Sequence, residues 1–383
     1  YVSSIENYSL FMERDTLIKW CDALLKIDSC NISALSKKAM ALSIDGKSSE
    51  ADKLYDRAFS LSPDDCRIWK SKGDALNYLK NYEEALECYD KVLVFDPLNS
   101  SVLKEKGYIL YIHGRYKDSA ECYNKALEID PNNAYLWCMK GNVLNSDKNY
   151  SEAINCYKRA METDSGEVLN NIYRNNIGKS LLSQEKYPEA CNWYDKALEV
   201  NNSYPYFWFG KAEALYKSGK YEEAIKCYYK GLEINPSYSG GWNSLGLILS
   251  ESGNYAEAME CFNRAISLSN SPARFNKGGI LVIYGKYEEA LKCYDESLKF
   301  LPEETIILTN KAYVLCEQNK YKEALEYYER ALSINPENSK AWNGKGEVLS
   351  VKDKKEEALR CFVDAVDFEP DYGRAWNNKG RIL

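Results

Sequence analysis

A period of 34 residues constrains this chain more than any other feature. In a 34-residue frame that counts Cys66 as place 1, ten successive repeats carry glycine or alanine at place 8 and tyrosine or phenylalanine at place 24. Place 20 is alanine in nine of the ten repeats, and place 32 is proline in seven. A period of this length through a 383-residue chain indicates an array of repeated units, not the two or three globular domains that length alone suggests.

The spacing within the frame predicts two helices in each repeat. Places 4, 8 and 11 share one face of a first helix, and places 20, 24 and 27 share one face of a second. Gly114, Gly219 and Gly285, each followed by a basic residue and a tyrosine, mark the turn between the helices. Proline at place 32 ends the second helix. A single helix pair cannot bury both of its faces, so we expect antiparallel pairs stacked into an all-α solenoid.

This set of places resembles the tetratricopeptide repeat family. The resemblance implies a right-handed superhelix of about 23 helices, in which the first helices line a concave groove through places 2, 5, 6, 9, 12 and 13. We expect residues 1–383 to form one array: a divergent repeat at 1–31, ten full repeats at 32–372, and a truncated first helix at 373–383. The chain is interpreted as a fragment, with further repeats or another domain beyond Leu383.

The frame slips twice. The spacing of the place-20 alanine is 37 residues from Ala153 to Ala190 and 32 residues from Ala258 to Ala290. One interpretation is drift in loop length, which surface loops tolerate. The other is a break in the superhelical pitch near 168–170 and 270–271, where the distance between consecutive repeats would depart from the mean of the chain.

Composition excludes several classes of protein. The net charge of −7 disfavours a nucleic-acid partner, which needs clustered basic residues. No apolar run approaches the ~18 residues of a membrane span. Thirteen cysteines without a CxxC pair, in a long helical chain, favour reduced thiols and a cytoplasmic location over a secreted disulfide scaffold or a zinc site.

Nothing in the sequence supports an active site. The one histidine, His113, has no patterned partner. The two Gly-Lys-Ser triplets lack the upstream glycine of a phosphate-binding loop. Seven cysteines recur at place 23, beside the buried face, where a small apolar filler suffices. We therefore expect a non-catalytic protein with no cofactor and no metal.

The candidate partner-binding residues are aromatic and amide side chains at groove places that stacking does not require. Aromatic anchors combined with adaptable amides are typical of protein-binding surfaces. The candidates are Tyr108, Tyr111, Tyr135, Asn142, Asn145, Asn176, Tyr206, Phe209, Asn276, Asn310 and Tyr313. We predict that changing Tyr108, Tyr135 and Phe209 to alanine leaves thermal stability nearly unchanged and weakens partner binding.

Asparagines cluster at places 5 and 6, and a side-chain amide can both donate to and accept from a peptide unit. This pattern resembles part of the asparagine ladder in the repeats of O-linked N-acetylglucosamine transferases; the alternative is solvated polar filler. A carboxylate clamp of the kind used by chaperone-binding relatives is not assembled, because Lys70 at place 5 is followed by Asp74 at place 9.

The function that these observations favour is a scaffold that holds a peptide or partner protein in its groove. One alternative is the substrate-recognition arm of a larger enzyme, such as an O-linked N-acetylglucosamine transferase-like glycosyltransferase. Another is self-association through the C-terminal end, where Trp376 lies on a first helix with no second helix after it and an apolar face would be exposed.

Overall fold

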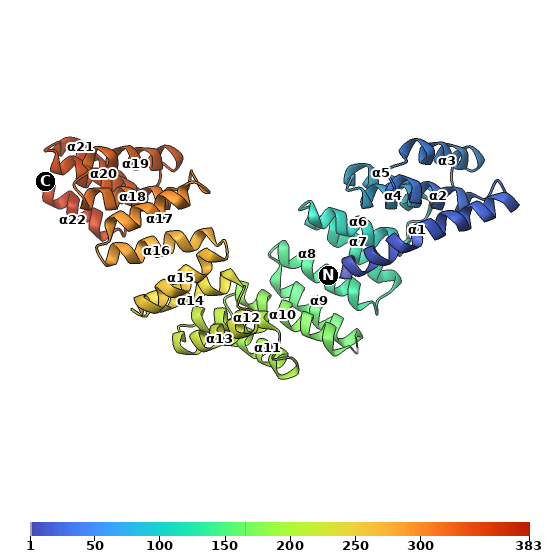
Figure 1. The fold of residues 1–383 in the computed structure, drawn as a ribbon, viewed down its shortest axis with the longest axis horizontal. Coiled ribbons are helices and arrows are strands. Elements are labelled where there is room, and N and C mark those ends of the chain that lie inside the picture. The colour runs from blue at the N-terminus through green and yellow to red at the C-terminus, as the bar shows by residue number, and fades with distance from the viewer. Residues whose placement is uncertain (1, 165) are drawn as a thin grey trace. The chain divides into compact units, whose positions relative to one another are not determined.

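A computed structural model describes residues 2–164 and 166–383. These residues form 22 α-helices and no strands (Figure 1). The first and last helices are α1 (Val2–Ile27) and α22 (Gly373–Ile382). Between them lie ten helix pairs: α2 (Ile32–Ile44) and α3 (Ser48–Leu61), α4 (Cys66–Tyr78) and α5 (Tyr82–Phe95), α6 (Ser100–Ile112) and α7 (Tyr116–Ile129), α8 (Ala134–Ser146) and α9 (Tyr150–Thr163), α10 (Glu167–Ser183) and α11 (Tyr187–Val200), α12 (Pro205–Lys217) and α13 (Tyr221–Ile234), α14 (Ser239–Glu251) and α15 (Tyr255–Ser267), α16 (Ser271–Ile283) and α17 (Tyr287–Leu298), α18 (Thr305–Glu317) and α19 (Tyr321–Ile334), and α20 (Ser339–Val351) and α21 (Lys355–Phe368).

The ten pairs confirm the predicted all-α solenoid architecture. The turn glycines Gly114, Gly219 and Gly285 have φ values of 73°, 80° and 68°, a region that glycine adopts without steric cost. The second helices of the proline-containing repeats end before the proline at place 32; α5, for example, ends at Phe95, two residues before Pro97.

The first 31 residues differ from the prediction. The sequence predicted a divergent helix pair there, whereas α1 is one continuous helix, Val2–Ile27, with 26 residues. Its sequence contains no glycine or proline, so it lacks the residues that most strongly break a helix. This accounts for 22 helices in the described chain, against the expected number of about 23.

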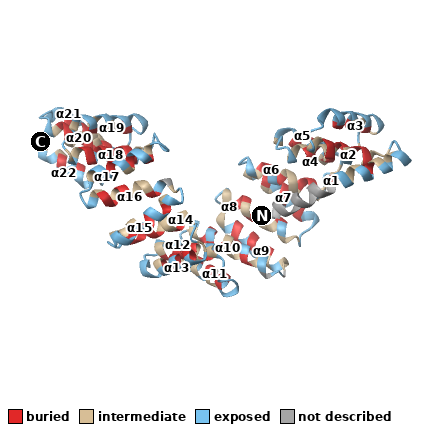
Figure 2. Cartoon of the chain, viewed as in Figure 1, coloured by how far each residue is buried: buried red, intermediate tan, exposed pale blue. Residues whose placement is uncertain are grey.

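The predicted core places are buried. The alanines at place 20, such as Ala85 and Ala153, are fully buried, and most of the rings at place 24 are too. Figure 2 shows buried residues where helices face their neighbours and exposed residues at the turns. A Cβ atom on Gly141 would lie 2.6 Å from the ring of Tyr157, and one on Gly278 would lie 2.5 Å from the ring of Tyr294. Glycine at place 8 therefore makes room for the ring at place 24.

Repeats with alanine at place 8 seat the ring differently. In the three such repeats that carry Ala39, Ala212 and Ala312, place 6 of the next repeat is Ser71, Ser244 and Gly344. A Cβ atom on Gly344 would lie 2.3 Å from Cζ of Tyr328, the place-24 ring of the preceding repeat. The place-24 ring therefore packs against the first helix of the next repeat when the alanine side chain at place 8 of its own repeat occupies the other position.

Two side chains tie consecutive repeats together. A tryptophan at place 4 donates its indole N–H to a backbone carbonyl six residues earlier, at place 32: Trp137 to Pro131 and Trp242 to Pro236, each at 2.8 Å. The lysine at place 7 reaches place 25 of the preceding second helix, as Lys345 does with Glu329 at 3.1 Å. Both places therefore hold one repeat against the next.

The two frame slips have different local forms. Helix α10 has 17 residues, whereas first helices such as α8 and α12 have 13. The extra residues of the 37-residue spacing therefore add a helical turn before place 1. The 32-residue spacing arises because α15 has 13 residues, one fewer than α13, and only 268–270 separate it from α16. The proposed breaks in pitch near 168–170 and 270–271 stay a prediction.

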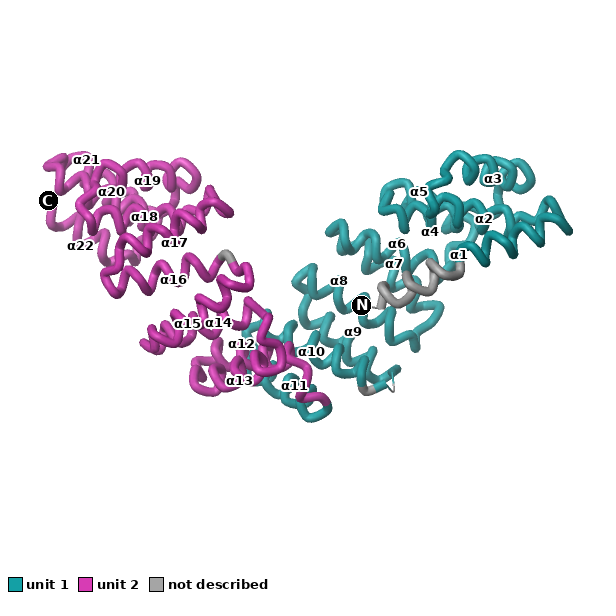
Figure 3. The backbone as a smooth tube through the Cα atoms, viewed as in Figure 1, with its two compact units in different colours: residues 1–200 teal, residues 201–383 magenta. Residues whose placement is uncertain are grey.

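The chain divides into two compact units, residues 1–200 and 201–383 (Figure 3). Unit 1 contains α1 to α11 and unit 2 contains α12 to α22. Neither unit has, in its described residues, a helix with the length and apolar character needed to cross a bilayer.

Candidate interaction surface

The surface formed by places 2, 5, 6, 9, 12 and 13 of the first helices is hollowed in both units. We call this surface the inner face. In unit 1, a pocket of about 370 Å³ lies between α2 and α4, where its lining includes Lys37, Arg67 and Lys70. In unit 2, a pocket of about 220 Å³ is lined by residues of α18, α20 and α22, together with Tyr328 and Tyr372. The places that the family resemblance assigned to the groove therefore line hollows in this chain.

Two of the predicted tyrosines of unit 1 are open to solvent. Tyr108 on α6 is 42% exposed and Tyr135 on α8 is 49% exposed. The ammonium group of Lys104 lies 5.8 Å from the centre of the Tyr135 ring. Tyr111 is only partly exposed, and its hydroxyl accepts a hydrogen bond from Ser146 at 3.4 Å. Tyr108 and Tyr135 are therefore aromatic groups that the stacking of helices leaves partly exposed.

The predicted asparagines of unit 1 bond between neighbouring repeats. The Asn142 side-chain oxygen accepts from the Tyr157 hydroxyl at 2.9 Å and from the Asn176 amide at 3.3 Å. The Asn145 side-chain oxygen accepts from the Ser180 hydroxyl at 2.7 Å. Part of the hydrogen-bonding capacity of these amides is thus used to join first helices.

The aromatic residues at the start of unit 2 form one cluster. Tyr206 on α12 is 43% exposed, and its ring centre lies 5.7 Å from that of Tyr238 and 6.2 Å from that of Phe209. The Tyr204 ring is tilted against the Tyr206 ring, with 5.4 Å between their centres. The cluster presents at least two exposed rings on a buried base.

Phe209 forms that base, which corrects the prediction that it can be replaced without loss of stability. Its side chain is only 7% exposed. A Cβ atom on Gly231 would lie 2.4 Å from the Phe209 ring, so the ring occupies space that alanine at place 27 would fill in other repeats. The prediction failed because glycine at place 27 of this repeat leaves room for the Phe209 ring to pack inward.

The other predicted residues of unit 2 lie along its inner face. The Asn276 amide donates to the Asn243 oxygen at 2.9 Å, which again joins two first helices. Asn310 and Tyr313 line the pocket of unit 2.

The same pocket contains a fixed ion pair that the sequence did not reveal. Arg374 donates to both carboxylate oxygens of Glu347, at 2.9 and 3.0 Å. The Asn378 amide donates to the Asn343 oxygen at 2.9 Å and lies 2.7 Å from Glu347 Oε1. Because Glu347 is held from several sides, this end of the inner face carries little unpaired charge.

Three tyrosines at place 34 were also missed by the sequence reasoning. Asparagine caps the next first helix at this place in several repeats; Asn99 and Asn133, for example, accept a backbone N–H of α6 and α8. Tyr204, Tyr238 and Tyr372 occupy the same place before α12, α14 and α22 and make no such bond. The sequence signal was the loss of a capping residue, which costs ~1 kcal/mol, in favour of a ring.

The cysteines of place 23 behave as packing residues. Six of the seven are buried, and Cys293 is partly buried. Burial raises the pKa of Cys88 and of Cys156 to about 11. The carboxylate clamp is not assembled at Lys70, since Lys70 pairs with Asp74 at 2.7 Å and Asp74 also accepts from the Tyr89 hydroxyl.

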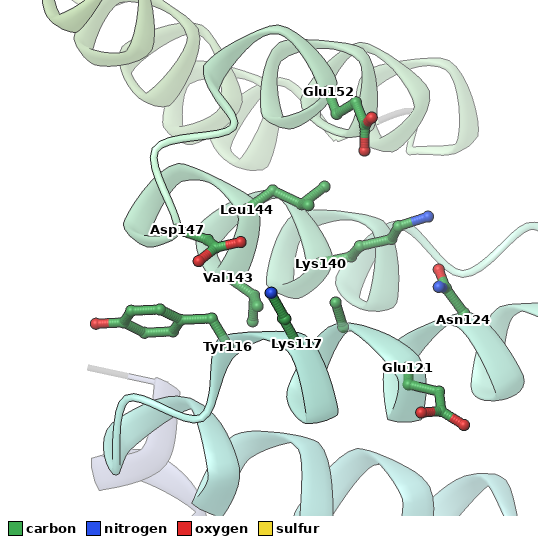
Figure 4. A pocket seen from close by; sticks show the side chains of 10 residues that line it. Tyr116, Lys117, Glu121, Asn124, Lys140, Val143, Leu144, Asp147 and Glu152 are labelled. Carbon is green, nitrogen blue, oxygen red and sulfur yellow. The ribbon is translucent and has the colours of Figure 1, made fainter.

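Another pocket in unit 1, of about 300 Å³, lies outside the inner face (Figure 4). Residues of α7 and α8, with Asp147 and Glu152, surround it, and lysines and carboxylates alternate around its opening. Its charges are mixed and no predicted site residue lines it.

Comparisons with known families match this repeat along the chain. The tetratricopeptide repeat description matches residues 66–99, 134–166, 205–238, 239–272, 306–338 and 327–360, and a TPR repeat description matches 107–146 and 178–219. Together these segments cover well over half of the chain. The chain belongs to the tetratricopeptide repeat family. A search of curated proteins found no match.

Solved structures share the fold at low sequence identity. The structure of the APC/C hetero-tetramer Cut9–Hcn1 is 14% identical, with a TM-score of 0.53 over 99% of this chain and 95% of that chain. A tetratricopeptide repeat protein from Parabacteroides merdae is 19% identical, with a TM-score of 0.52 over 65% of this chain and 98% of that chain. PilF of Pseudomonas aeruginosa is 18% identical, with a TM-score of 0.50 over 57% of this chain and 100% of that chain.

Proposed function

We propose that this tetratricopeptide repeat protein is a non-catalytic scaffold that binds a peptide or partner protein along its inner face. The observation that carries the proposal is the exposure of Tyr108, Tyr135 and Tyr206, each between 42% and 49%, at places that the helix stacking does not use. Exposed aromatic anchors beside polar groups contribute most of the binding energy at many protein interfaces.

The amides support the same function. An asparagine amide has two N–H donors and a carbonyl oxygen with two lone pairs. The hydrogen bonds of Asn276 and Asn176 to the preceding repeat each use one donor, so hydrogen-bonding capacity remains for a peptide backbone. Because these bonds also fix the side chains, the amides are oriented before a ligand arrives, which lowers the entropy lost on binding.

A peptide-display library screened against the full chain would test the proposal. The double variant Tyr108→Ala/Tyr135→Ala should lose selected binders, because each tyrosine offers its ring to a ligand. Tyr229→Ala is the matched control, since Tyr229 is 39% exposed on the second helix α13. An inner-face site would be contradicted by selected peptides that bind the double variant and a Tyr206→Ala variant as tightly as they bind the unchanged protein. Melting curves of all variants would show that the fold is retained.

A further inference from the structure

The charge of the inner face differs between the two units. On the first helices α2, α4, α6, α8 and α10 of unit 1, the charged groups at its six places are five cations and two carboxylates: Lys37, Arg67, Lys70, Lys104, Lys179, Asp74 and Glu105. In unit 2 the same places carry four carboxylates and four cations: Glu213, Glu251, Glu317, Glu347, Lys217, Lys340, Arg374 and Arg381. The excess of cations in unit 1 stands out because the whole chain has a net charge of −7.

The carboxylates of the unit 1 inner face are already neutralised by their neighbours. Asp74 pairs with Lys70 at 2.7 Å, and Glu105 pairs with Lys104 at 3.2 Å. Asp65 caps α4 beside this face and pairs with Arg67 at 2.5 Å. With Asp65 included, five cations face three carboxylates, so positive charge remains on this surface.

Three of those five cations gather around the pocket between α2 and α4. Lys37, Arg67 and Lys70 line it, together with Met40, one carboxylate, Asp74, and the serines Ser33, Ser36 and Ser71. The Arg67 side chain is 62% exposed although it pairs with Asp65, so its guanidinium remains accessible to another carboxylate. Arginine and lysine side chains bind carboxylates through charge-assisted hydrogen bonds. The hydroxyls of Ser36 and Ser71 already donate to backbone carbonyls, so the basic side chains would make the contacts.

We propose that the inner face of unit 1 binds an extended acidic segment of a partner protein, with carboxylates at the α2–α4 pocket and apolar side chains on Tyr108 and Tyr135. This inference rests on the proposed scaffold function and specifies its ligand. Helices pack ~10 Å apart, and an extended residue spans ~3.3 Å. A segment of roughly 8–12 residues therefore reaches from α2 to α8.

Fluorescence anisotropy with the full chain and labelled peptides of about 12 residues would test the acidic preference. The probes alternate leucine or phenylalanine with glutamate, with lysine, or with glutamine. At about 50 mM salt the glutamate peptide should bind roughly ten times more tightly than the lysine peptide, and its affinity should fall as salt rises. Lys37→Glu/Lys104→Glu should weaken it about ten-fold, while Lys53→Glu, an exposed lysine on α3, should not.

The outcomes separate this inference from the proposed function. Equal binding of the three peptides, or charge-reversal variants that bind normally, would overturn the acidic ligand while leaving an inner-face scaffold in place. Tighter binding of a single-stranded oligonucleotide than of the glutamate peptide would overturn it in favour of nucleic acid. Failure of the scaffold itself would appear in the display screen, as binders indifferent to Tyr108 and Tyr135. If the Lys37→Glu/Lys104→Glu variant does not fold, Lys179→Glu on α10 provides the same charge-reversal comparison.

Discussion

Replacing Gly344 by alanine tests how the place-24 rings are seated. Gly344 lies in α20, and a Cβ atom there would be 2.3 Å from Cζ and 2.4 Å from the hydroxyl of Tyr328. Tyr328 is 3% exposed, so its ring has little room to move. Overpacking of this kind costs ~1–3 kcal/mol, and alanine returns ~1 kcal/mol of helix propensity. We expect a net loss of up to about 2 kcal/mol.

The same reasoning predicts a rescue. Ala312 occupies place 8 in the repeat of Tyr328. The change Ala312→Gly would create the space for the Tyr328 ring that glycine at place 8 provides in other repeats. The double variant Ala312→Gly/Gly344→Ala should therefore be more stable than the sum of the single changes predicts, by about 1–2 kcal/mol in a double-mutant cycle.

Urea unfolding followed by circular dichroism in the far ultraviolet measures these differences. Gly279→Ala in α16 is the control, because a Cβ atom there meets nothing within 4 Å, and it should be neutral or stabilising by up to ~1 kcal/mol. The comparison uses the transition that reports on unit 2, since repeat arrays can unfold in more than one step. The explanation that Tyr328 packs against Gly344 because Ala312 blocks the alternative position would be refuted by two results together. These are a Gly344→Ala variant as stable as Gly279→Ala, and additive effects in the double-mutant cycle.

Two further predictions follow from burial. Phe209→Ala should cost ~3–5 kcal/mol of unfolding free energy, whereas Tyr206→Ala should cost under ~1 kcal/mol; similar losses in urea melts would contradict the placement of Phe209. Burial raises the thiol pKa of Cys88, Cys261 and Cys361 from 9.0 to about 11, so the folded state holds these protons more tightly. The stability they contribute is complete below about pH 9 and is lost as pH rises through about 11, so melting temperatures should fall across that range. Rapid alkylation of these three thiols in the folded protein at about pH 8, mapped by peptide mass spectrometry to separate them from the exposed Cys30, would contradict this.

The sequence predicted most of the fold because its signals are local and repeated. A place that recurs ten times reveals its constraint even where one repeat departs from it, as Ser119 does at place 20. The helix α1 was not predicted correctly because a frame fitted to residues 1–31 found apolar matches but no breaking residue between two helices. The division near Val200 reflects how the helices pack in space and has no counterpart in the period.

The candidate surface was predictable only in part. Tyr108 and Tyr135 are exposed as their places suggested, but the exposure of a ring at place 5 depends on a residue far along the chain, as Gly231 shows for Phe209. The excess of lysine and arginine in unit 1 could have been counted from the sequence once the groove places were assigned. It was hidden by the net negative charge of the whole chain.

The tryptophan bonds at the start of the repeats also set a rule for chain length. Each spans six residues, from the indole of Trp342 to the carbonyl of Pro336, for example, at 2.8 Å. Such a bond fixes the number of residues in that interval, because one residue more or fewer would move the indole away from its acceptor. The two repeats that begin after a slip have Arg174 and Arg274 at place 4 instead. Insertions and deletions in this array can therefore accumulate only at connections between repeats that lack the tryptophan bond. These are also the connections where an unrelated segment could be inserted with the smallest loss of stability.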